Sequence, residues 1–66
     1  MRRVYSGRGC EITEENGIYR ISWEQGIFGQ IAEYEISKEN AERAMRSDDD
    51  AYAVKIFAET GKWPPV

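Results

Sequence analysis

The sequence predicts an α+β domain, in which a three-stranded antiparallel meander is followed by two helices packed on one sheet face. Three observations lead to this fold class. Apolar and polar residues alternate through the first half of the chain, as in half-buried strands. An Asn-Gly pair between two alternating runs marks a tight hairpin turn. The second half has helical periodicity, with serine caps before both expected helices.

The chain has 66 residues, which suffices for one domain with a small core. We expect residues 1–66 to form this domain, with residues 1–8 as a basic N-terminal arm that is free to flex. The arm contains Arg2, Arg3 and Arg8 and no acidic residue. The remainder contains six basic and twelve acidic residues, so the body of the protein is acidic.

The first predicted hairpin turns at residues 16–17. Asparagine and glycine both tolerate the positive φ that a type I′ turn needs, which makes this pair a strong hairpin signal. A two-residue loop here pairs Ile12 with Ile21 and Cys10 with Trp23. All four apolar side chains then lie on the same face of the sheet.

The second predicted hairpin turns at residues 26–29, where an Ile-Phe pair lies between two glycines. A four-residue loop pairs Trp23 with Ala32 and Ile21 with Tyr34. These pairs continue the apolar face of the first hairpin. A slip of one residue in either hairpin would scatter the apolar side chains over both faces, so the agreement supports the meander.

The opposite sheet face is predicted to be polar and acidic. There Arg20 falls opposite Glu35, which is a favourable cross-strand pair. Paired carboxylates perform acid–base catalysis only in a concave, desolvated pocket, and a domain of this size rarely has one. We interpret the face as a surface for a basic partner, and a face that serves only solubility is the alternative. Its candidate partner-binding residues are Glu11, Glu24, Glu33 and Glu35.

Two helices are expected after the sheet. Ser37 is a suitable N-cap for a helix over residues 38–46, and Ser47 can cap a second helix over residues 48–60. Gly61 is a fitting residue to end it. A single helix from residue 38 to residue 60 is the alternative, which three consecutive aspartates in its middle disfavour.

The second helix is the expected cover of the sheet. The side chains that fall on one side of it are Ala51, Val54, Phe57 and Ala58. Tyr52 and Ile56 lie on the other side, four residues apart. They either pack on the first helix or form a patch for a partner or a second copy.

Two further candidate anchors are aromatic residues outside the regular elements. Phe28, at the second hairpin turn, is a candidate anchor for a partner, because exposed aromatic side chains are common hot spots of interfaces. The alternative is that this turn curls over the edge of the core. Trp63, after the second helix, is expected to fold back and close the end of the core, and it is a further candidate anchor.

The composition excludes several kinds of active site. The chain has no histidine and one cysteine, which excludes catalytic triads, cysteine–histidine dyads, intrachain disulfides and four-cysteine metal sites. We expect Cys10 to be a buried, unreactive thiol. The contiguous aspartates 48–50 diverge on a helix, so we assign them to capping and not to a metal. The sequence therefore predicts a protein without catalytic activity, metal or other cofactor.

We predict a small acidic protein-binding module that inhibits or regulates a larger partner by occluding it. A nucleic-acid-handling enzyme with a basic groove fits the acidic face. In size and charge the chain resembles the small acidic proteins that block a larger enzyme, among them immunity proteins, antitoxins and phage-borne inhibitors of host defence. One alternative is a self-associating structural or assembly subunit, in the simplest case a homodimer. The other is a nucleic-acid accessory protein that uses its N-terminal arginines.

Two further expectations concern the surroundings of the protein. Direct nucleic-acid binding by the sheet is disfavoured, because phosphate contacts need a basic face. The sequence shows neither a signal peptide nor an apolar run of membrane-spanning length, and a lone thiol fits a reducing compartment. We therefore expect a cytoplasmic protein without a membrane partner.

Overall fold

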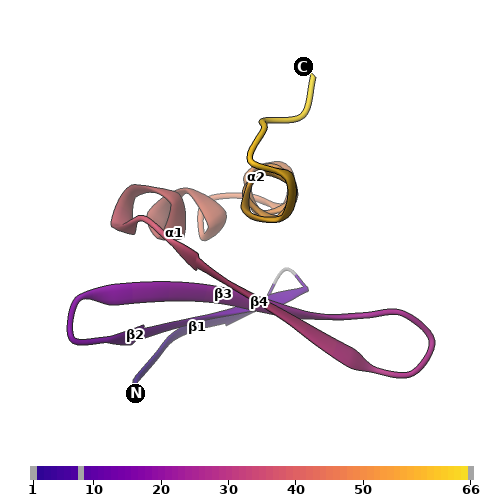
Figure 1. Ribbon diagram of the computed structural model, residues 1–66. Coiled ribbons are helices and arrows are strands. Elements are labelled where there is room, and N and C mark those ends of the chain that lie inside the picture. Colours follow the sequence, from indigo (N-terminus) through magenta and orange to yellow (C-terminus); the bar gives the residue numbers. More distant parts are fainter. Residues whose placement is uncertain (1, 8, 66) are drawn as a thin grey trace.

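The computed structural model describes residues 2–7 and 9–65 and shows a two-layer α+β fold. A four-stranded antiparallel sheet has the order β1-β2-β3-β4, and both helices lie on one side of it (Figure 1). We call the helix-covered side the inner face and the other side the outer face. The elements are β1 (Arg2–Gly7), β2 (Cys10–Glu15), β3 (Ile18–Gln25), β4 (Gln30–Ile36), α1 (Lys38–Ala44) and α2 (Asp48–Thr60).

The fourth strand corrects the predicted three-stranded meander. Most of the segment that the sequence suggested as a basic arm forms β1, which pairs antiparallel with β2; Arg8 lies outside the described residues. The register shifts between Arg3 and Tyr5, so that Val4 and Tyr5 are both half-buried against the core. Such a bulge breaks the alternation of period two by which strands are recognised in a sequence.

The predicted registers of the other two hairpins are confirmed. Ile12 lies opposite Ile21 across β2 and β3, while Ile21 lies opposite Tyr34 across β3 and β4. The first turn has the expected geometry, since Asn16 has a φ of 54° and Gly17 a φ of 82°. A hydrogen bond also supports the turn, because the Gly17 amide donates to the side chain of Glu14 at 2.8 Å.

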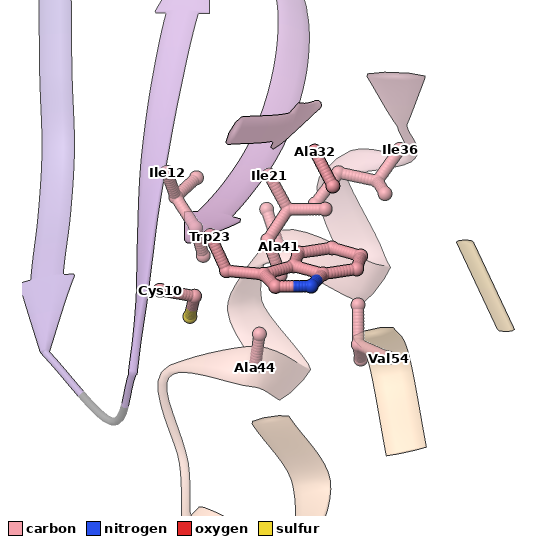
Figure 2. Packing of buried hydrophobic residues seen from close by; sticks show 9 residues of the cluster. All are labelled: Cys10, Ile12, Ile21, Trp23, Ala32, Ile36, Ala41, Ala44 and Val54. Carbon is pink, nitrogen blue, oxygen red and sulfur yellow. The ribbon is translucent and has the colours of Figure 1, made fainter. Parts of the chain in front are cut away.

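The core lies between the inner face and the helices (Figure 2). Ile12 and Ile21 from the sheet and Val54 from α2 are its largest fully buried side chains. Each contributes about 1.5–3 kcal/mol by leaving water. The buried cluster consists of Cys10, Ile12, Ile21, Trp23, Ala32, Ile36, Ala41, Ala44 and Val54.

The segment after the sheet forms two helices rather than one. The Oγ of Ser37 accepts a hydrogen bond from the Asn40 amide at 3.1 Å and so caps α1. Ser47 is extended, with φ −160° and ψ 166°, and interrupts the helical path before α2. Gly61 ends α2 in the left-handed conformation, with a φ of 79°. Only the end of α1 differs from the prediction, since it lies at Ala44 instead of residue 46.

Candidate protein-binding surfaces

The four predicted acidic residues all project from the outer face of the sheet. Glu11, Ser22 and Glu33 form one row across β2, β3 and β4. Glu24 and Glu35 are on the same face as this row. Glu24 lies two residues beyond Ser22 toward the β3–β4 turn, and Glu35 lies two residues beyond Glu33 away from that turn. Three of the four are exposed, and Glu11 is half-buried. The structure thus brings these four carboxylates together on one surface.

Basic residues balance only part of this surface. The Arg3 Nε lies 3.3 Å from a carboxylate oxygen of Glu11, and Arg20 lies opposite Glu35 in the sheet, as predicted. Within residues 2–7 and 9–65, neither Glu24 nor Glu33 has an ion-pair partner. Among the described residues, Glu24 and Glu33 are thus carboxylates without an ion pair, and they lie on the half of the outer face nearest the β3–β4 turn.

The same half of the outer face is hollowed. An open hollow there has a lining that includes Glu11, Glu24, Glu33, Ser6, Ser22 and Ile31. Ile31 lies opposite Glu24 in the sheet and is 66% exposed. The surface thus combines carboxylates with an apolar side chain that the protein itself leaves uncovered.

The tip of the β3–β4 hairpin extends this apolar character. Figure 1 shows the hairpin reaching beyond the helix layer, so the tip does not curl over the core. Ile27 is 91% exposed and Phe28 is 83% exposed. Phe28 is therefore accessible, as an anchor for a partner must be. We name the surface formed by Glu24, Glu33, Ile31, Ile27 and Phe28 the hairpin surface.

The sequence interpretation did not select Ile27 or Ile31 as site residues. A signal for Ile31 was available, because the register places this large apolar residue at a position that the alternation assigns to water. Ile27 shares the turn with Phe28, and a turn between two glycines has little structure of its own to bury either side chain.

The remaining two predicted residues lie elsewhere on the molecule. Tyr52 and Ile56 are on α2, on the side of the helix away from the buried Val54. Tyr52 is 60% exposed, whereas Ile56 is half-buried. Because α2 covers the inner face, these two residues are separated from the hairpin surface by the thickness of the fold. The seven candidate residues thus do not form a single surface.

Trp63 and Phe57 occupy positions that differ from the prediction. Their rings stack with centroids 4.3 Å apart, and neither belongs to the buried cluster of the core. The guanidinium of Arg43 lies 4.4 Å from the centroid of the Trp63 ring. Trp63 therefore packs against residues of the two helices instead of closing the core beneath them, and it remains partly exposed.

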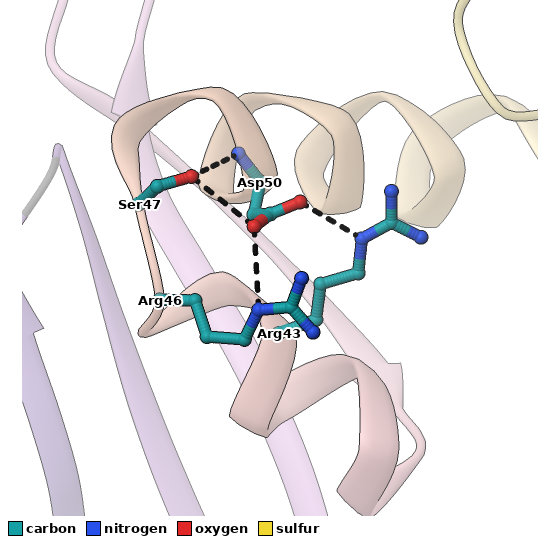
Figure 3. A network of polar contacts seen from close by, with 4 residues as sticks. All are labelled: Arg43, Arg46, Ser47 and Asp50. Atoms are coloured by element: carbon teal, nitrogen blue, oxygen red, sulfur yellow. Dashed lines mark hydrogen bonds and ion pairs between the residues drawn. The ribbon is translucent and has the colours of Figure 1, made fainter.

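Ser47 caps α2, as predicted, and the three aspartates lie in the first turn of the helix. Figure 3 shows the contacts of Asp50. The Asp50 amide donates a hydrogen bond to the Ser47 Oγ at 3.1 Å. The Asp50 carboxylate accepts one from the Arg43 Nε at 3.1 Å and lies 3.5 Å from the Arg46 Nε. The hydrogen bond from Arg43 is the main reason why the pKa of Asp50 is below its ordinary value of 3.8. Within residues 2–7 and 9–65, no group of three potential ligands could hold a metal ion.

Comparisons with known proteins found no relative. No family model matches the chain, and no curated protein or solved structure matches it significantly. Of the helices in the described part of the chain, none combines the length and the apolar character needed to cross a membrane. The functional argument therefore depends on the surfaces described above.

Proposed function

We propose that this protein is a non-enzymatic binding module that occludes a basic groove on a larger protein, such as the nucleic-acid groove of an enzyme. One observation carries the proposal. The outer face is free of the helices, and its half nearest the β3–β4 turn combines Glu24 and Glu33 with the exposed Ile31. Within residues 2–7 and 9–65, neither carboxylate has an ion-pair partner. The apolar tip at Phe28 adjoins this half.

Each part of the hairpin surface has a distinct role in this proposal. The carboxylates of Glu24 and Glu33 attract a basic groove over a distance and so raise the rate of association. The apolar side chains of Phe28 and Ile31 are buried on contact and slow dissociation, because desolvated aromatic and aliphatic anchors supply most of the energy of an interface. The domain then blocks the groove by its bulk.

The experiment begins by capturing the partner with tagged protein from lysate of its own source and identifying it by mass spectrometry. Binding of the purified partner is then measured with the variant Glu24→Lys/Glu33→Lys. We expect its association rate constant to fall about tenfold or more at low salt and to depend less on salt than that of the wild type. Dissociation should change less.

A matched control distinguishes a specific face from net charge. The variant Glu42→Lys/Glu59→Lys makes the same change in net charge, but its exposed residues lie on the two helices. It should associate nearly as fast as the wild type. Equal rates for the two variants, or unchanged rates for both, would count against an acidic recognition face.

Self-association through α2 is the second candidate function, and the 60% exposure of Tyr52 favours it. The variant Tyr52→Ser should then abolish a concentration-dependent rise in mass.

The structure offers less support for a nucleic-acid accessory role, because Arg2 lies 3.1 Å from a Glu14 oxygen and Arg3 lies 3.3 Å from a Glu11 oxygen. A salt-sensitive gel shift that is lost on deleting residues 1–8 would support that role.

A further inference from the structure

The sheet has two open edges, and they are complementary in direction. β1 and β4 are the outermost strands of the sheet, and an edge strand presents unpaired backbone N–H and C=O groups. Because each strand is antiparallel to the next and there are four of them, β4 runs antiparallel to β1. A second copy placed beside the first in the same orientation thus brings its β1 antiparallel to β4 and continues the sheet.

The two edges are also complementary in charge. β1 contains Arg2 and Arg3 and no acidic residue, whereas β4 contains Glu33 and Glu35 and no basic residue. The side chains of all four residues are exposed, although Arg2 and Arg3 already form ion pairs with Glu14 and Glu11 of β2. Arg3 shares the outer face with Glu33 and Glu35, whereas Arg2 lies opposite Glu14 on the inner face. Opposite charges on the same face of neighbouring strands attract, and like charges repel. Pairing of β4 with β4, or of β1 with β1, would bring like charges together and is disfavoured. Charge therefore favours a head-to-tail contact over a two-fold dimer.

The inner side of the β4 edge has room for an added strand. A hollow lies where α2 passes over the end of β4, and its lining includes Ile36, Phe57 and Ala58. On β1, Val4 and Tyr5 are only half-buried within their own domain. In a second copy with the same orientation, the inward-facing Tyr5 lies level with Tyr34 of β4, two residues before the Ile36 that lines the hollow.

We propose that this protein self-associates head to tail, with β1 of one copy adding to β4 of the next. The inference does not rest on the proposed occluding function, although Glu33 belongs to both surfaces, and it involves a different surface from Tyr52. The contact does not close on itself, since each added copy exposes a new β4 edge. The right-handed twist of strands, about 20–25° per strand, would turn successive copies about a common axis.

The test is sedimentation velocity of the purified chain from about 10 µM to about 1 mM, the range of weak association. We expect the weight-average mass to rise steadily with concentration without stopping at a dimer. The rise should be smaller in about 1 M salt than in about 0.05 M salt, because salt screens exposed charges. A monomer throughout this range, or a dimer that grows no further, overturns the proposal.

Two charge reversals test the pairing directly. Glu33→Lys/Glu35→Lys gives a basic β4 beside a basic β1, and Arg2→Glu/Arg3→Glu gives an acidic β1 beside an acidic β4. Each variant alone should have an association constant at least about tenfold lower than the wild type. An equimolar mixture should recover association, because each β4 then meets an oppositely charged β1. Failure of the mixture to recover it overturns the proposal.

Controls keep this test decisive. Circular dichroism reports whether each variant is folded. If a charge reversal unfolds the domain, the neutral variants Glu33→Gln/Glu35→Gln and Arg2→Gln/Arg3→Gln are used in its place. Each neutral variant should associate more weakly than the wild type. Tyr52→Ser, on α2 and away from both edges, should leave the association unchanged. Loss of association in Tyr52→Ser together with unchanged association in the edge variants would assign the contact to α2 instead.

Discussion

The two faces of the sheet are built from the same strands, yet only one of them holds the fold together. Ile21 on the inner face of β3 is fully buried, whereas Ile31 on the outer face of β4 is 66% exposed. The two residues are chemically identical, and the pleat of the strands decides which face each one joins. Ile21 contributes to folding through its burial. Ile31 is not needed for that purpose, so its apolar surface is available for binding.

The largest expected effect comes from shortening the inner isoleucine. Ile21→Ala should lower the free energy of unfolding by about 2–5 kcal/mol, because it leaves a cavity in the centre of the core. A domain of this size has a total stability of about 3–10 kcal/mol. Urea unfolding followed by circular dichroism would therefore show a much lower midpoint, or a chain that is largely unfolded without urea.

The matched variant on the outer face is Ile31→Ala. Its effect on the free energy of unfolding should stay within about 0.5 kcal/mol, since the removed atoms are already in contact with water. The same urea experiment measures it. A loss as large as that of Ile21→Ala would show that another part of the protein, or another copy, covers the outer face in solution.

The packing of α2 on the inner face of the sheet depends on the residue at which this helix begins. Ser47→Ala removes the hydroxyl that accepts the Asp50 amide, so we expect a loss of about 1 kcal/mol in the free energy of unfolding. Ser6, an exposed residue of β1, supplies the control, because Ser6→Ala removes a hydroxyl without a capping role. Thermal unfolding should separate the two variants by a few degrees, and equal melting temperatures would contradict the capping role.

The last expected effect concerns pH. The pKa of Asp50 is lowered in the folded state, mainly by its hydrogen bond with Arg43, so folding favours the charged carboxylate. Its contribution to stability is thus complete above the unfolded pKa of about 3.8 and is lost as pH falls through the lower folded pKa. The stability difference between the wild type and Asp50→Asn should shrink between about pH 5 and about pH 2. A difference that is constant over this range would contradict the assignment.

The candidate site was predictable to a different degree at each residue. Alternation and the register placed Glu24 and Glu33 on one face, because side-chain direction in a strand follows from residue parity alone. Exposure of Phe28 was one of two alternatives, since a turn can fold over the core or away from it. The division of the candidates between the sheet and α2 depended on the packing of the two layers, which the sequence does not specify residue by residue.

By itself the sequence determined the registers of two hairpins and the start of α2. These features depend on local chemistry, namely the positive φ of the turn at residues 16–17, the parity of the strands and the serine cap of the helix. Only the tertiary structure decided that residues 2–7 form β1, because the shift after Arg3 breaks the local pattern and pairing with β2 compensates for it. It also decided the position of Trp63, which depends on contacts with Arg43 and Phe57 from two separate helices.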